Sequence, residues 1–217
     1  MKISLKQVFK ESWKQVKGSL GFFVPLFFLV VIVSLFFGVK NQNTLSLFGI
    51  INILISPLMS YAITNSAIKI SRNEKVKLGL VFKDLDLKTY GKFLAIVLLM
   101  NVALALLASL SGLLNGYNPF IGNVLTSLFF LMLFTYFIGV MFFPYYRLID
   151  GSKNIWRTIK ESFEMGVGNR TFLFKFFIVL FLLNIVGIMA FGFGLLVTAP
   201  LTSVAIANVY DKIKNKS

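Results

Sequence analysis

The side chains of this sequence that could do acid–base or metal chemistry are few. The 217 residues include no Cys and no His. Thiolate nucleophiles, Ser-His-Asp triads, histidine switches and His/Cys zinc sites are therefore excluded by composition. Two close pairs of acids remain, Asp84 with Asp86 and Glu161 with Glu164. Both pairs have lysines beside them, which favours a solvated, salt-bridged surface over acid–base catalysis. We expect neither enzyme activity nor a bound cofactor.

A second set of candidate residues is neutral and lies near two prolines. Pro57 and Pro200 fall inside long apolar segments, where proline frees a backbone carbonyl. Paired breaks of this kind across a repeat build binding sites in transporters, but a packing kink with interhelical hydrogen bonds is the favoured alternative. The candidate helix-break and polar-pocket residues are Pro57, Ser60, Asn65, Pro200, Ser203 and Asn208.

The elements that must position these residues are long apolar segments. Hydrophobic residues make up 57% of the chain and charged residues 14%, against about 25% charged in ordinary soluble domains. Each apolar run is long enough to cross the roughly 30 Å hydrocarbon core as a helix. The runs are Leu20–Val39, Leu45–Ile68, Phe93–Leu114, Ile121–Tyr146 and Phe172–Tyr210, the last of which we expect to break at Phe191–Gly194 into two helices. An all-α integral membrane fold with six transmembrane helices follows.

The distribution of charge predicts the orientation of these helices. The net charge is +14, and all Lys and Arg residues except Lys40 and Lys175 lie in residues 1–18, 69–92, 147–171 and after Tyr210. Confinement of basic residues to alternate connections is the positive-inside pattern, so both termini are expected to be cytoplasmic in a bacterial cytoplasmic membrane. Five spans, with residues 198–210 in the interface, is the main alternative. The same confinement argues against nucleic acid as a partner.

An internal repeat organises the chain. Pro57–Ile70 and Pro200–Ile213 are identical at eight of fourteen positions when aligned at a constant shift. Phe9–Trp13 resembles Ile159–Phe163 in the same way, and Val81–Asp84 is a shorter third copy. We therefore expect one membrane domain, residues 1–217, built from repeat units of about 1–70, 71–150 and 151–217, the middle one degenerate. Each unit is predicted to be an interfacial amphipathic helix followed by a transmembrane hairpin.

The first of these amphipathic helices shows the clearest pattern. Apolar residues recur at helical spacing from Leu5 to Val16, and lysines line the opposite face. Such a helix is expected to lie among lipid headgroups and anchor the bundle, with anionic-lipid sensing or partner docking as the alternative. Partners would be lipids of the anionic leaflet, another membrane protein or a second copy of the chain. The candidate lipid-interface residues are Lys6, Lys10, Trp13, Lys14, Lys17, Trp156, Arg157 and Lys160.

Two short motifs carry a resemblance to a known family. Gly192–Pro200, followed by Ala205, Ala207 and Tyr210, resembles the closing signature of the YciC-like polytopic membrane proteins, which are related to the membrane domain of some glycerophosphodiester phosphodiesterases. Glu161–Phe163 with its following glycines resembles that family's cytoplasmic helix before the last hairpin. The resemblance implies a membrane scaffold of about six helices. The catalytic barrel of the phosphodiesterases is absent from this sequence, so their activity is not implied.

These features predict a non-enzymatic, polytopic membrane protein that acts through lipid or a membrane partner, with envelope stress or toxin immunity as possible roles. The alternative is a small transporter, or the membrane subunit of one, with a neutral polar site near the proline-containing helices. No ionisable residue lies within the interior of a predicted span, which argues against a proton-coupled mechanism.

Overall fold

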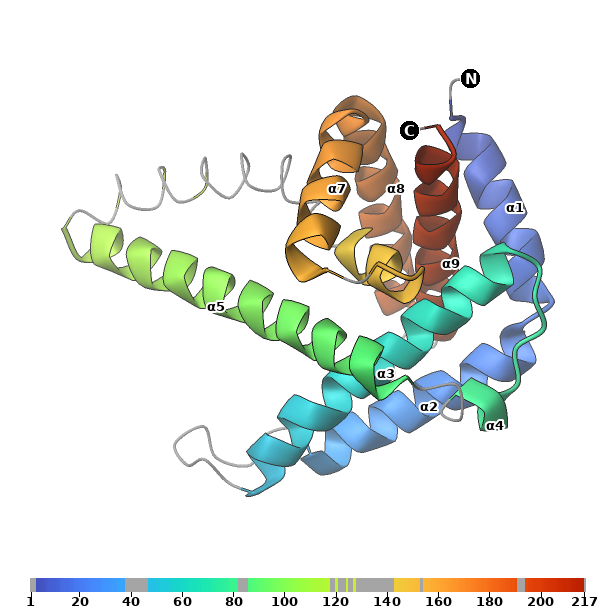
Figure 1. Cartoon of the computed structure of the whole chain (residues 1–217), viewed down its shortest axis with the longest axis horizontal. Coiled ribbons are helices and arrows are strands. Elements are labelled where there is room, and N and C mark those ends of the chain that lie inside the picture. Colours follow the sequence, from blue (N-terminus) through green and yellow to red (C-terminus); the bar gives the residue numbers. More distant parts are fainter. Residues whose placement is uncertain are drawn as a thin grey trace. The chain divides into compact units, whose positions relative to one another are not determined.

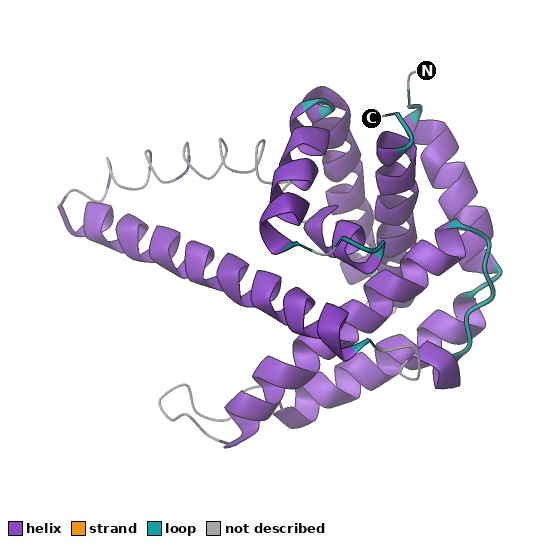
Figure 2. Ribbon diagram, viewed as in Figure 1, coloured by secondary structure: helices purple, strands orange, loops and turns teal. Residues whose placement is uncertain are grey.

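The structure of this protein is a computed structural model. It describes residues 3–37, 47–81, 86–117, 120, 124, 127, 143–152, 154–190 and 194–216. Within these residues the chain forms helices and their connections, with no strand (Figure 2). The predicted all-α class is confirmed. Most of the predicted fourth span lies outside the described residues.

The helices of the first and third repeat units follow the same order. The first unit contains α1 (Leu5–Lys17), α2 (Leu20–Phe37) and α3 (Leu47–Ser71); the third contains α7 (Ile155–Val167), α8 (Arg170–Met189) and α9 (Leu195–Lys214). Between them lie α4 (Leu78–Val81), α5 (Leu87–Tyr117) and a further helical stretch at residues 143–149.

The helices match the predicted segments in most places. The expected break near residue 191 is confirmed, because α8 ends at Met189 and α9 begins at Leu195. Of the middle copy, Val81–Asp84, the structure describes only Val81, the last residue of the four-residue α4. The prolines do not break their helices: Pro57 lies inside α3 and Pro200 inside α9.

The chain folds into two compact units, and their boundaries cut across the repeats. One unit combines Met1–Tyr90 with Lys175–Ser217, so it contains α1 to α4, most of α8 and all of α9. The other unit is Gly91–Phe174 and contains most of α5, residues 143–149 and α7.

In the first unit, α9 packs against α1, α2 and α3 (Figure 1). Small buried residues at these contacts, such as Ala62 and Ala67 on α3 and Ala205 and Ala207 on α9, let helix backbones approach closely. The fully buried Tyr210 lies near the C-terminal end of α9. The last helix of the chain is therefore the centre of this unit.

The first helix packs against the last because of a short buried stripe. Val8, Ser12 and Val16 are fully buried and lie four residues apart, on one face of α1. The ring of Phe9 contacts that of Phe176 on α8, with centroids 5.7 Å apart. The lysines of α1 lie off this stripe and are exposed.

In the second unit, α7 resembles α1. Both helices have 13 residues, and each ends at a glycine whose N–H donates back to carbonyls of the last turn. The Asn154 side chain caps the start of α7 by accepting from the N–H groups of Trp156 and Arg157. The Glu161 carboxylate accepts from Arg157 and from Arg147, each at 2.7 Å. These bonds hold the pKa of Glu161 below its ordinary value.

Among the described residues, one helix, α8, is both long and apolar enough to cross a membrane, and Leu20–Val30 is a shorter apolar segment. The six-span arrangement stays a prediction.

Candidate functional site

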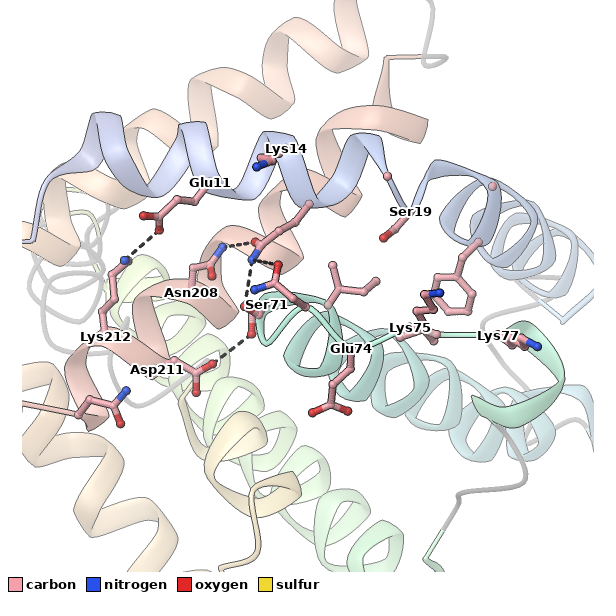
Figure 3. Close-up of a pocket in the computed structure, with 18 residues that line it drawn as sticks. Glu11, Lys14, Ser19, Ser71, Glu74, Lys75, Lys77, Asn208, Asp211 and Lys212 are labelled. Atoms are coloured by element: carbon pink, nitrogen blue, oxygen red, sulfur yellow. Dashed lines mark hydrogen bonds and ion pairs between the residues drawn. The ribbon is translucent and has the colours of Figure 1, made fainter.

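A cleft of about 960 Å³ opens where three parts of the first unit meet. One wall is the end of α1 and the start of α2, from Glu11 to Phe22. A second is the end of α3 and the connection that follows it, from Ile70 to Lys77. The third is the C-terminal part of α9, from Asn208 to Asn215 (Figure 3). Residues from both ends of the sequence therefore share one site.

Amide and hydroxyl groups join the three walls. The Asn208 Nδ2 group donates to Ser12 Oγ and to Gln15 Oε1, each at 2.8 Å. Gln15 Nε2 in turn donates to the backbone carbonyl of Ser71 at 2.9 Å and lies 3.5 Å from Asn73 Oδ1. Buried polar side chains that are satisfied in this way fix the arrangement of the helices that carry them.

Two of the carboxylates of the cleft are held by cations. Asp211 lies 2.7 Å from the guanidinium of Arg72, and its carboxylate also accepts from Ser71 Oγ at 3.1 Å. Glu11 lies 2.9 Å from Lys212 Nζ. The hydrogen bond from Lys212 lowers the pKa of Glu11 below its ordinary value. Both carboxylates are therefore engaged by a cation of the same unit.

Three other lysines face the same cleft without such partners. Lys14 lies on α1, and Lys75 and Lys77 lie on the connection after α3. Among the described residues, no carboxylate lies within 4.0 Å of these three ammonium groups. The third acid of the cleft, Glu74, points away from Lys14 in Figure 3. The cleft therefore has an excess of positive charge along its rim.

The turn after α3 brings two of these lysines to the cleft. Asn73 has a φ of 60°, the left-handed conformation that Asn tolerates better than most residues. The N–H of Glu74 then donates to the carbonyl of Lys69 at 2.9 Å, which closes the end of the helix. The chain reverses here, and residues 75–77 run along the cleft.

Of the predicted polar-pocket residues, only Asn208 lines this cleft. Ser60 is exposed, and Asn65 is buried. Ser203 Oγ donates to the carbonyl of Ala199 in its own helix. Asn184, another polar residue within a predicted span, bonds Thr202 between α8 and α9 at 2.8 Å, which matches the expectation of interhelical hydrogen bonds.

The predicted lipid-interface residues lie on two exposed helix faces. On α7 they are Trp156, Arg157 and Lys160; on α1 they are Lys6, Lys10, Trp13, Lys14 and Lys17. Of all eight, Lys14 alone lines the described cleft.

We did not predict from the sequence that Gln15, Ser71, Asn73 and Asp211 belong to one site. One signal pointed toward it: Ser12 is a polar residue on the apolar stripe of an amphipathic helix, between Val8 and Val16. Such a residue needs a hydrogen-bond partner from whatever packs against it.

The polar groups that meet in the cleft are amides, hydroxyls and ion-paired charges. No group of three or more potential metal ligands occurs among the described residues. Comparisons with family models, with curated proteins and with solved structures found no match to this chain. The resemblance to the YciC-like proteins stays a prediction.

Proposed function

We propose that this chain is a multi-pass protein of the bacterial cytoplasmic membrane that acts through lipids or a membrane partner and not by catalysis. Its spans would number six, as three hairpins led by basic amphipathic helices, with both termini in the cytoplasm. Envelope stress and toxin immunity are the physiological settings that this architecture suits.

The observation that carries the proposal is the exposure of large apolar side chains along α8. Phe181 is 64% exposed, Val186 62% and Met189 76%. Exposing such side chains to water forgoes about 25 cal/mol for each Å² of apolar surface. Hydrocarbon removes that penalty, so a helix exposed in this way suits lipid.

Other predicted spans support the same conclusion. Phe28 and Ile32 on α2 are about half exposed, and Leu106 and Leu113 on α5 are more so. None of the residues of α2 is charged. The charged cleft, in contrast, is built from the end of α1, the end of α3 and the end of α9. Exposed apolar side chains thus lie along α2, α5 and α8, and the charged groups of the cleft lie at helix ends, which supports a location in a bilayer.

The transporter alternative is weaker on the described residues. It requires neutral polar groups to converge near Pro57 and Pro200. Instead, Ser203 bonds within its own helix, and Asn208 turns its amide to α1. We therefore prefer a scaffold or lipid-dependent role.

Single-cysteine labelling tests the topology directly, since the chain has no native Cys. Gln42→Cys and Asn118→Cys lie in the predicted outer connections and should react with an impermeant maleimide in intact cells. Lys10→Cys and Ser217→Cys should react only after permeabilisation. A chain that fractionates without membranes, or that labels equally at all four positions, would refute the proposal. External labelling of Ser217→Cys together with Gln42→Cys and Asn118→Cys, but not of Lys10→Cys, would support five spans.

A further inference from the structure

We propose that the cleft between α1, the end of α3 and α9 binds a phosphate-bearing anion through Lys14, Lys75 and Lys77. The lipid source of such an anion is the headgroup of an acidic phospholipid, and the soluble source is free phosphate. The lipid part of this inference rests on the proposed membrane location; the phosphate chemistry does not.

The cleft contains positive charge that its own carboxylates do not neutralise. Its two engaged carboxylates, on Glu11 and Asp211, are bound to Lys212 and Arg72. Lys14, Lys75 and Lys77 remain, against one further lining carboxylate, that of Glu74, and no described carboxylate lies within 4.0 Å of the three ammonium groups. Figure 3 shows Lys75 and Lys77 on the other side of the cleft from Lys14, and ammonium groups that line one cleft raise the local concentration of anions. Phosphate, with several acceptor oxygens, can accept from more than one of them at once.

Hydrogen bonds and an ion pair between its walls hold the cleft in place. Gln15 is fixed by Asn208 on one side and by the Ser71 carbonyl on the other. Asp211 is fixed by Arg72. An anion would therefore meet walls that are already in place, and little ordering of side chains other than the lysines would accompany binding.

The position of the cleft on the amphipathic helix α1 also favours a lipid headgroup as the ligand. Trp13 precedes Lys14 and is 45% exposed, although its neighbour Ser12 is fully buried. An exposed Trp beside lysines is typical of a helix at headgroup level. A headgroup phosphate would then lie at the same depth as the rim of the cleft. Ser19 and Gly21, at the start of α2, also line the cleft.

The test compares two triple variants with the same loss of charge. The cleft variant is Lys14→Gln, Lys75→Gln and Lys77→Gln. The matched control is Lys6→Gln, Lys10→Gln and Lys17→Gln, which removes three exposed lysines of α1 that do not line the cleft. All six positions are exposed, so both variants should keep the fold, which circular dichroism and thermal unfolding of the full chain in detergent would verify.

Two probes distinguish the sources of the anion. One is short-chain phosphatidylglycerol, with short-chain phosphatidylcholine as the uncharged comparison, titrated into the detergent-solubilised full chain. The other is inorganic phosphate, followed by isothermal titration. Binding of the lipid without measurable binding of inorganic phosphate would identify the headgroup as the ligand. Comparable affinity for both would identify the free anion.

We expect the cleft variant to bind the probe more than about tenfold more weakly than the native chain, and the control to bind within about threefold, because each juxtaposed lysine adds to the attraction only when it reaches the phosphate. Equal losses in the two variants would show only a diffuse charge effect and would overturn the site. Undiminished binding by the cleft variant, or no binding of either probe by the native chain, would overturn it as well. The labelling experiment fails or succeeds independently of these results.

Discussion

Two serines at matching places in the repeat have different surroundings. Ser12 and Ser162 follow a Lys-Glu pair in the two related helices, and both are fully buried. Ser12 Oγ donates to the carbonyl of Val8 and accepts from Asn208, each at 2.8 Å. Ser162 Oγ has no hydrogen-bond partner among the described residues. The same sequence motif therefore gives a hydrogen-bonded buried hydroxyl at Ser12 and a buried hydroxyl without a described partner at Ser162.

The two alanine variants should have effects of opposite kind. Ser12→Ala removes one acceptor from the buried Asn208 amide and should lower the free energy of unfolding by about 1 kcal/mol. Ser162→Ala removes a buried hydroxyl that has no partner, and should be neutral or stabilising by up to about 1 kcal/mol. Reversible unfolding in mixed micelles, followed by circular dichroism, measures both. Similar losses in the two variants would contradict the hydrogen bonds described here.

At the scale of helices, two glycines, one on α8 and one just before α9, lie close together. A Cβ placed on Gly194 would lie 2.6 Å from the carbonyl oxygen of Gly187 and 2.7 Å from its Cα. A Cβ on Gly187 would meet Thr198 Oγ1. The two glycines therefore let the helices turn back on each other within a few residues.

Substituting these glycines should separate the helices. Gly194→Ala places a methyl group against backbone atoms, which cannot move as a side chain can, and should cost about 1–3 kcal/mol of stability. Gly112→Ala on α5 is the matched control, because nothing lies within 4 Å of its added Cβ. Alanine there should stabilise the helix by about 0.5–1 kcal/mol. Thermal unfolding in detergent measures both; stabilisation by Gly194→Ala would show that the helices do not cross as described.

Helices could be predicted from sequence at this scale, and their partners could not. Long apolar runs predicted α2, α3, α5 and α8, because a helix is the only way such a run satisfies its backbone in lipid. The helical spacing of residues 5–16 predicted α1, and the glycines near residue 192 predicted the break before α9. The pairing of α1 with α9 could not be predicted from the local sequence of either helix, because it depends on long-range packing.

The candidate site was harder to predict for the same reason. Its residues come from three segments, and each segment alone resembles an ordinary charged surface. Lys14 was predicted to meet lipid from the charge of its helix. The role of Gln15, its neighbour, depends on Asn208 nearly two hundred residues away. The repeat singled out Asn208 because of its match to Asn65, but gave no sign that only Asn208 would face α1.

At the scale of the whole chain, side chains of α9 join the two ends of the sequence. Asn208 bonds both Ser12 and Gln15, and Lys212 forms an ion pair with Glu11. Helix α1 is held further by the buried stripe that includes Val8 and Val16, and by the bond from Gln15 to the Ser71 carbonyl. Loss of the Asn208 amide should therefore release the N-terminal helix before the rest of the chain unfolds.

Hydrogen exchange of the Asn208→Ala variant measures this release. Amide exchange in α1 should accelerate about tenfold, because two buried hydrogen bonds, each worth about 0.5–1.5 kcal/mol, no longer resist local opening. Exchange in α7 should not change. Asn65→Ala is the matched control: it removes the equivalent amide of the first repeat unit, which has no described bond to α1, and should leave α1 exchange at the native rate. Acceleration spread evenly over α1 and α7 would mean that Asn208 supports the whole fold and does not specifically hold the N-terminal helix.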